Sequence, residues 1–176
     1  MVLGAMTLRA AALFDGAASV SHSSTAANLT LSTSGSDFSS DVEGLLPAAA
    51  ATRAITLDPG GTGDIGSVKL TTTATVSSLL DTDADDGLQV RIDRCSQAWD
   101  GSEDAYTCGG STSEVLDDRS IIMSAVTLGN VDVSAGAHNY LVVTITLSAT
   151  ADASFENLAS TIQFMFVAQQ RTPGPR

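Results

Sequence analysis

Two cysteines are the first residues whose type and spacing suggest chemistry. Cys95 and Cys108 flank a short segment that carries Trp99 and Tyr106 but neither His nor a further Cys, so a metal site lacks ligands there. Disulfides persist in oxidising compartments. We therefore predict a Cys95–Cys108 disulfide and a location outside the cytosol, with two free thiols as the alternative. Closing so short a loop contributes about 2–3 kcal/mol of stability.

The acidic segment at residues 81–87 (DTDADDG) is the candidate metal site. Its carboxylates are hard oxygen ligands of the kind that Ca²⁺ takes in sets of about six to eight. The candidate ligands are Asp81, Asp83, Asp85 and Asp86. However, Gly87 lies one place late for a D-x-D-x-D-G loop, and no Glu follows at the twelfth position. Because Asp and Gly form turns between strands, a turn is the favoured interpretation and calcium the alternative.

Catalytic motifs are missing from the sequence. The two histidines, His22 and His138, belong to no HExxH pattern, and neither a GxSxG elbow nor a phosphate-binding loop is present. Counting residues leaves a Ser/His/Asp triad open, although both histidines lie in turn-like contexts that favour surface positions. Carboxylate pairs such as Asp117 and Asp118 have no neighbours in sequence that would raise a pKa. We predict that the chain is not an enzyme and needs no cofactor apart from the calcium alternative.

The composition limits the partners of the chain. Its 176 residues carry 20 acidic and 8 basic side chains, which gives a net charge of −12. An acidic surface without a basic cluster disfavours nucleic-acid binding. The apolar stretch at residues 1–14 is interrupted by Arg9 and is shorter than the roughly 20 residues that span a bilayer. We expect no membrane span, and we interpret this stretch as the end of a signal peptide or as an N-terminal strand.

The elements that would position these residues are strands. Segments rich in β-branched residues alternate apolar and polar positions, which is typical of half-buried strands. The predicted strands cover residues 27–33, 52–57, 65–80, 88–93, 139–149 and 161–168. We expect a turn at residues 58–61 (DPGG), a helix or loop at 42–51 and a long disulfide-bearing loop at 94–118.

These strands predict an all-β fold, a jelly-roll-like sandwich of about eight antiparallel strands. Residues 1–171 would form this single domain, and residues 172–176 would be a disordered tail.

Several short motifs occur in the order found in the TasA/camelysin family of secreted fibre and spore-coat-associated proteins, which this chain resembles. They are AALFD at residues 11–15, NLTL at 28–31, ITLDPG at 55–60, the block 87–99 with 106–110, and the ending at 155–171. The cysteine block is similar to the form common in actinobacterial members. The Gly that normally follows the Asn at position 157 is missing here.

The resemblance implies a secreted jelly-roll subunit of extracellular matrix filaments, in which an N-terminal segment of one subunit completes the sheet of the next. We expect this donor strand within residues 6–20. The expected assembly residues are Leu8, Ala10, Ala12, Leu13, Phe14 and Val20. Partners would be copies of the chain and other matrix proteins.

Three alternatives remain at this point. The N-terminal segment could be an ordinary first strand of its own fold. The protein could instead be a monomeric cell-surface binding module that uses the loop between Cys95 and Cys108. A camelysin-like metalloprotease is the third alternative, and the chain shows no zinc motif that would support it.

Overall fold

The computed structural model describes residues 11–15, 29–34, 45–61, 65–102 and 105–171. Its strands are β1 (Ala11–Asp15), β2 (Leu29–Ser34), β3 (Ala50–Gly61), β4 (Ile65–Val76), β5 (Leu88–Cys95), β6 (Trp99–Asp100), β7 (Thr107–Cys108), β8 (Thr112–Ser120), β9 (Met123–Thr127), β10 (Asn139–Leu147) and β11 (Ala159–Gln170). A short helix α1 (Leu79–Thr82) and a 3₁₀ turn η1 (Ala153–Phe155) complete the described elements.

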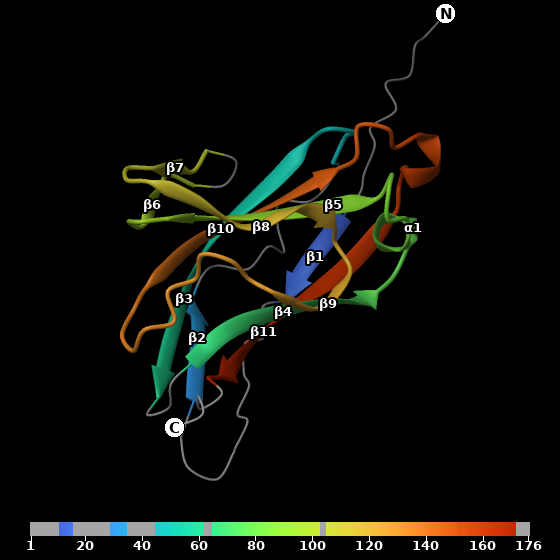
Figure 1. Ribbon diagram of the computed structural model, residues 1–176. Coiled ribbons are helices and arrows are strands. Elements are labelled where there is room, and N and C mark those ends of the chain that lie inside the picture. The colour runs from blue at the N-terminus through green and yellow to red at the C-terminus, as the bar shows by residue number, and fades with distance from the viewer. Residues whose placement is uncertain (1–10, 16–28, 35–44, 62–64, 103–104, 172–176) are drawn as a thin grey trace, which may run out of the picture.

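The strands form two facing sheets, one above the other in Figure 1. One sheet has the order β1-β11-β4-β9, and the other has the order β2-β3-β10-β5-β8. With β2 set aside as an extra edge strand, the two sheets have the strand order of a jelly roll, except that β1 pairs with β11 in parallel. The predicted all-β sandwich is therefore confirmed. The small hairpin β6–β7 lies at one end of the sandwich, and α1 lies at the other.

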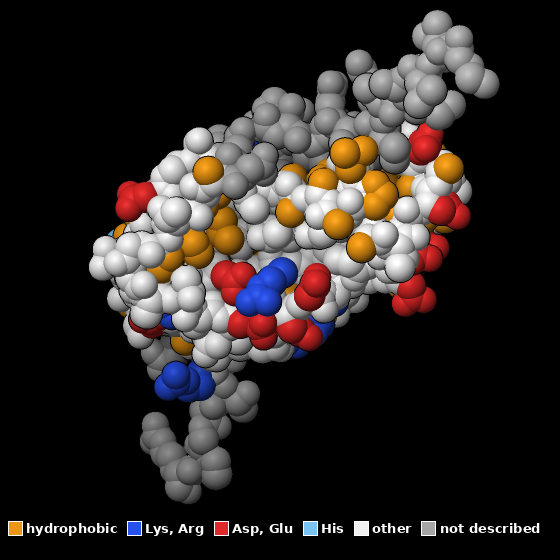
Figure 2. All heavy atoms as spheres, turned by 90° about the horizontal axis from the view of Figure 1, so that it is seen from above, with side chains coloured by type: hydrophobic (Ala, Val, Ile, Leu, Met, Phe, Trp, Pro, Cys, Tyr) orange, Lys and Arg blue, Asp and Glu red, His pale blue; other side chains and the backbone are white. Residues whose placement is uncertain are grey.

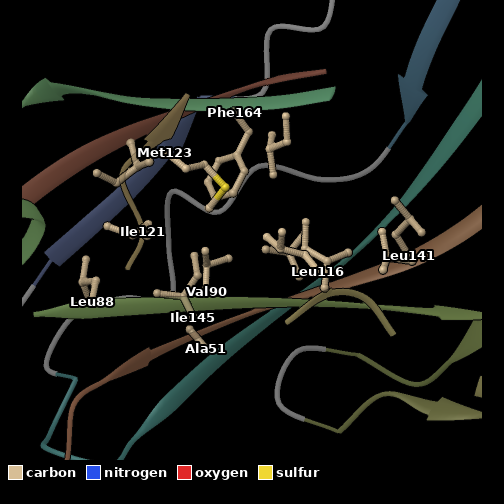
Figure 3. Packing of buried hydrophobic residues seen from close by; sticks show 14 of the residues in the cluster. Ala51, Leu88, Val90, Leu116, Ile121, Met123, Leu141, Ile145 and Phe164 are labelled. Carbon is tan, nitrogen blue, oxygen red and sulfur yellow. The ribbon is translucent and has the colours of Figure 1, made fainter. Parts of the chain in front are cut away.

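The core fills the space between the two sheets (Figure 3). On three strands alternate side chains are buried in this core, as the period-two pattern predicts, although Val142 of β10 is buried as well. These buried side chains are Leu88, Val90 and Ile92 of β5, Leu141, Val143, Ile145 and Leu147 of β10, and Ile162, Phe164 and Phe166 of β11. Burial of such side chains supplies the main stabilising term, at roughly 1.5–3 kcal/mol each.

The predicted strand at residues 65–80 was too long. β4 ends at Val76, and the chain then turns into α1 because Ser78 caps it. The Ser78 hydroxyl accepts a hydrogen bond from the Leu80 N–H, and the Asp81 carboxylate accepts one from the Ser78 N–H. This reciprocal capping box stabilises a helix start, so it overrides the β-propensity of the preceding residues.

The turn expected at residues 58–61 was also wrong. β3 continues through Pro59 to Gly61 and pairs with β2, with Leu31 opposite Pro59. Pro59 is tolerated because the ladder between β3 and β10 ends at the Leu57–Asn139 pair, so the missing N–H of Pro59 interrupts no bond to β10.

The sequence pattern missed two strands of the sandwich, β8 and β9, and the short hairpin of β6 and β7. Part of the expected loop at residues 94–118 belongs to β8, and β9 follows soon after it. In β8 two consecutive residues, Val115 and Leu116, are both buried, because register shifts interrupt its pairing with β5. A bulged strand of this kind loses the period of two that identifies strands from sequence. The segment expected as a helix or loop forms a turn at residues 47–48 before β3 begins at Ala50.

Candidate functional site

The edge of the four-stranded sheet is the first candidate site. β1 lies at this edge and pairs with β11 in parallel, with register partners that run from Ala11–Ala159 to Asp15–Gln163. All other described strand pairs are antiparallel. β1 is therefore a parallel edge strand of a sandwich whose other described strand pairs are antiparallel.

The predicted assembly residues fall partly on this strand. Ala12, Leu13 and Phe14 belong to β1, opposite Ser160, Thr161 and Ile162 of β11. Leu8, Ala10 and Val20 lie outside the described residues. The structure thus brings the apolar motif AALFD, which the sequence analysis singled out, against the last strand of the sandwich.

The opposite edges are less suited to receive another strand. β9 is only five residues long, and Ala125 has a positive φ of 51° with its N–H bonded to the Thr71 hydroxyl at 2.9 Å. β8 is interrupted by register shifts and carries the exposed carboxylates Asp117 and Asp118. Bulges, short length and charge are the usual means by which a sheet edge avoids pairing with another chain. Of these three edges, the one that β1 occupies is therefore the best suited to strand addition.

The disulfide hairpin is the second candidate site. Cys95 and Cys108 form a disulfide with a Cα–Cα distance of 5.7 Å, as predicted, and the strands β6 and β7 pair inside the loop that it closes. Gly101 makes the turn between them with a φ of 105°, where a Cβ would lie 2.4 Å from the Ala105 carbonyl oxygen. The Trp99 indole N–H donates to the Tyr140 carbonyl at 3.0 Å and ties the hairpin to β10. A disulfide here is consistent with an oxidising, extracellular environment.

A histidine and a carboxylate lie close to this hairpin. His138 Nδ1 lies 2.8 Å from Asp58 Oδ1, and the His138 ring stacks on Tyr140 with centroids 6.1 Å apart. No sequence signal pairs residues 58 and 138, because they come together only through the β3–β10 pairing. Both groups are accessible to solvent, so we regard this contact as a surface hydrogen bond rather than as part of a catalytic triad.

The carboxylates of the acidic segment make separate structural contacts. Asp81 is buried and accepts hydrogen bonds from the Ser77 hydroxyl at 2.7 Å, the Ser78 N–H at 2.7 Å and the Ser160 hydroxyl. It therefore fastens α1 to β11. Its partners are donors, which a carboxylate needs when it leaves water.

The remaining acids of this segment shape a turn. Asp83 Oδ1 accepts from the N–H groups of Asp85 and Asp86, while Asp86 accepts from the Thr150 hydroxyl. A Cβ on Gly87 would lie 2.3 Å from the Asp83 carbonyl oxygen, so only glycine fits there. These contacts agree with the turn that the sequence favoured. Among the described side chains, no three His, Cys, Asp or Glu residues gather into a group that could hold a metal ion.

The outer face of the five-stranded sheet carries a group of mixed charge. Arg91 lies 2.8 Å from Asp93 and 3.4 Å from Glu114, and the hydrogen bond to Asp93 raises the pKa of Arg91. Arg119 pairs with Asp117, and both residues lie on the neighbouring strand β8. Viewed from above Figure 1, acidic and basic side chains gather together (Figure 2). Such exposed pairs contribute little stability, about 0–1 kcal/mol each.

Comparison with models of known protein families found no match, and comparison with curated proteins found none either. In the part of the chain that the structure describes, no helix is long and apolar enough to cross a membrane.

Proposed function

We propose that the chain is a secreted structural subunit that polymerises into extracellular filaments by strand exchange, in the manner of the TasA/camelysin family that it resembles. The β1 strand of each subunit would leave its own sheet and pair with β11 of the next subunit in the same position. The parallel β1–β11 pair at an open sheet edge is the observation that carries this proposal.

Exchange of β1 would conserve the contacts that β1 makes. Because the five register partners from Ala11–Ala159 to Asp15–Gln163 are the same in either arrangement, exchange costs no pairing energy. Its cost is the entropy of association, which falls as the protein concentration rises. The equilibrium between the two arrangements is therefore concentration-dependent.

The chain is long enough to make the exchange. The 13 residues at 16–28 connect β1 to β2. At full extension they reach about 43–47 Å. A domain of this size has a diameter on the order of 40 Å, so β1 can reach a neighbouring copy.

The acidic charge makes assembly dependent on salt. At a net charge of −12, identical copies repel each other. The Debye length falls from about 30 Å at 0.01 M salt to about 10 Å at 0.1 M, so added salt removes most of this repulsion. We expect filaments to form more readily as salt and protein concentration increase.

The test is electron microscopy of the purified full chain over a series of concentrations, beside a variant that lacks residues 6–20. The full chain is expected to form filaments with one subunit repeat, whereas the truncated chain is expected to stay monomeric and folded. Filaments from the truncated chain would contradict strand exchange. Single particles from the full chain at every concentration would contradict the structural function itself.

The disulfide hairpin supports a second candidate, a monomeric binding module of the cell surface. The hairpin is rigidified by the Cys95–Cys108 bond and anchored through Trp99, while Gly109 and Gly110 on it are exposed. Preorganised loops of this kind lose little entropy when they bind. Replacing residues 96–107 with a short turn should then abolish binding to cells without changing the oligomeric state. Unchanged cell binding would remove this candidate.

A further inference from the structure

The first two residues of β11 have a described strand on one side only. Ala159 and Ser160 are the register partners of the first two residues of β1. The pairing of β11 with β4 begins only at Thr161, which lies opposite Val76, the last residue of β4. If β1 leaves, none of the described strands therefore pairs with residues 159 and 160.

The short helix α1 takes the place of a strand beside these two residues. The chain enters α1 soon after β4 ends, and α1 lies next to the start of β11 (Figure 1). Ser160 is 1% exposed, and its hydroxyl donates a hydrogen bond to the Asp81 carboxylate. The same hydroxyl lies 2.7 Å from the Ser78 hydroxyl, from which it accepts. Two side chains at the start of α1 thus hold the backbone of β11 at a position that β4 does not reach.

The carboxylate at the centre of this cluster is buried without a cation. Asp81 is 5% exposed and forms no ion pair with any described residue. Its donors are the Ser77 hydroxyl and the Ser78 N–H, each at 2.7 Å, and the Ser160 hydroxyl. Burial of a carboxylate is costly unless such donors replace its water. Because hydrogen bonds are directional, this set of donors fixes where the start of β11 lies relative to α1.

We propose that the serine–aspartate cluster of Ser77, Ser78, Asp81 and Ser160 keeps the start of β11 extended while β1 is absent. The β1 strand of the next copy can then pair at all five register positions. This proposal rests on the strand exchange proposed above. Without the cluster, only residues 161–163 of the acceptor would still be held by β4 when the new strand arrives.

The cluster acts on assembly through conformational entropy. An acceptor residue that is already ordered loses no backbone freedom when β1 binds, whereas a frayed residue loses it at that moment. Ordering one residue changes an equilibrium constant by roughly five- to thirtyfold. Two of the five register positions depend on the cluster. Loss of the cluster should therefore weaken strand exchange by about tenfold or more.

Hydrogen exchange of the full chain, measured at a concentration where it is monomeric, tests the cluster directly. Ser160→Ala and Asp81→Asn break the same hydrogen bond from its two sides. In both variants the amides of residues 159–161 should exchange about tenfold faster or more than in the native chain, because local opening exposes them. The amides of residues 164–170, which β4 holds, should follow global stability only. Unchanged exchange at residues 159–161 would overturn the proposal.

Polymerisation of the same variants tests the consequence for assembly. The lowest protein concentration at which filaments appear should rise about tenfold or more in Ser160→Ala and in Asp81→Asn. Thr72→Val is the matched control, because it removes a buried hydroxyl of β4 that bonds Ile121 and Met123, away from β1. At a temperature where all variants are folded, this control should polymerise at nearly the native concentration. An equal rise in all three variants would overturn the proposal, since assembly would then follow global stability.

The two measurements separate the cluster from strand exchange itself. Filaments from every variant at the native concentration would overturn the role of the cluster and leave strand exchange intact. Absence of filaments from the native chain at every concentration would overturn strand exchange and, with it, the role of the cluster in assembly. Hydrogen exchange would still show in that case whether the cluster orders residues 159–161.

Discussion

Phe14 of β1 and Ile162 of β11 occupy the same register position in the parallel pair at the edge of the four-stranded sheet. Ile162 is completely buried in the core between the sheets. Phe14 is thus the register partner of a core residue. In the proposed exchange, a second copy supplies the apolar residue at this position.

Phe14→Asp should prevent polymerisation. A carboxylate at a position registered with a buried isoleucine is costly, because an unpaired charge cannot leave water cheaply. We expect filament formation, followed by light scattering, to fall to the baseline. Thr112→Asp changes the net charge equally on the opposite sheet and should polymerise normally; a similar loss in that variant would indicate a charge effect instead.

Asp81→Ala should destabilise the fold by about 2–3 kcal/mol, because the Ser78 N–H and the buried Ser160 lose their acceptor. Asp85→Ala removes an exposed carboxylate of the same segment and should change the free energy of unfolding by less than about 0.5 kcal/mol. Urea denaturation measures both values.

Calcium added during that denaturation distinguishes the two interpretations of residues 81–87. If the segment is a turn, calcium leaves the unfolding midpoint of the native chain unchanged. If it is a calcium site, calcium raises the midpoint, and both alanine variants lose part of that rise.

Thr72→Val should cost about 1–3 kcal/mol. The buried Thr72 hydroxyl donates to the Ile121 carbonyl and accepts from the Met123 N–H at 2.9 Å, so valine leaves two backbone groups without this partner. Thr73→Val, one residue further on the exposed side of β4, is the matched control and should be nearly neutral. Equal midpoints in thermal unfolding would contradict this role of Thr72.

The double variant Cys95→Ala, Cys108→Ala should unfold with a free energy lower by about 3 kcal/mol, the entropy of closing a loop with a sequence separation of 13. Because the disulfide closes the hairpin β6–β7 and not the β1 edge, the variant should still polymerise below its unfolding temperature. Loss of polymerisation in a folded variant would place the hairpin in the assembly contact.

The sequence predicted the parts of this fold that depend on local pattern. Val90 and Ile92, for example, lie on β5, where the alternation runs unbroken from Leu88 to Ile92, and both are fully buried as expected. The disulfide was predicted from the pair of cysteines and from the lack of further metal ligands beside them. The fold class could therefore be predicted from the sequence alone.

What the sequence missed depends on tertiary context. Val115 and Leu116 are buried side by side because β8 is bulged, and no two-residue period reveals such a strand. The sequence around Pro59 predicts a turn. Pro59 nevertheless belongs to β3, because the pairing of β3 with β10 ends before it, at Leu57, and β2 pairs with β3 there.

The most direct test of strand exchange uses the register of Leu13 and Thr161, which face each other across β1 and β11. Directly opposed strand positions are close enough for a disulfide, so the variant Leu13→Cys, Thr161→Cys can be linked by mild oxidation. If β1 is exchanged, oxidation of the polymer links each copy to the next, and a non-reducing gel shows a ladder of covalent oligomers. A single band of internally linked monomer would contradict the account and make β1 an ordinary strand of its own domain.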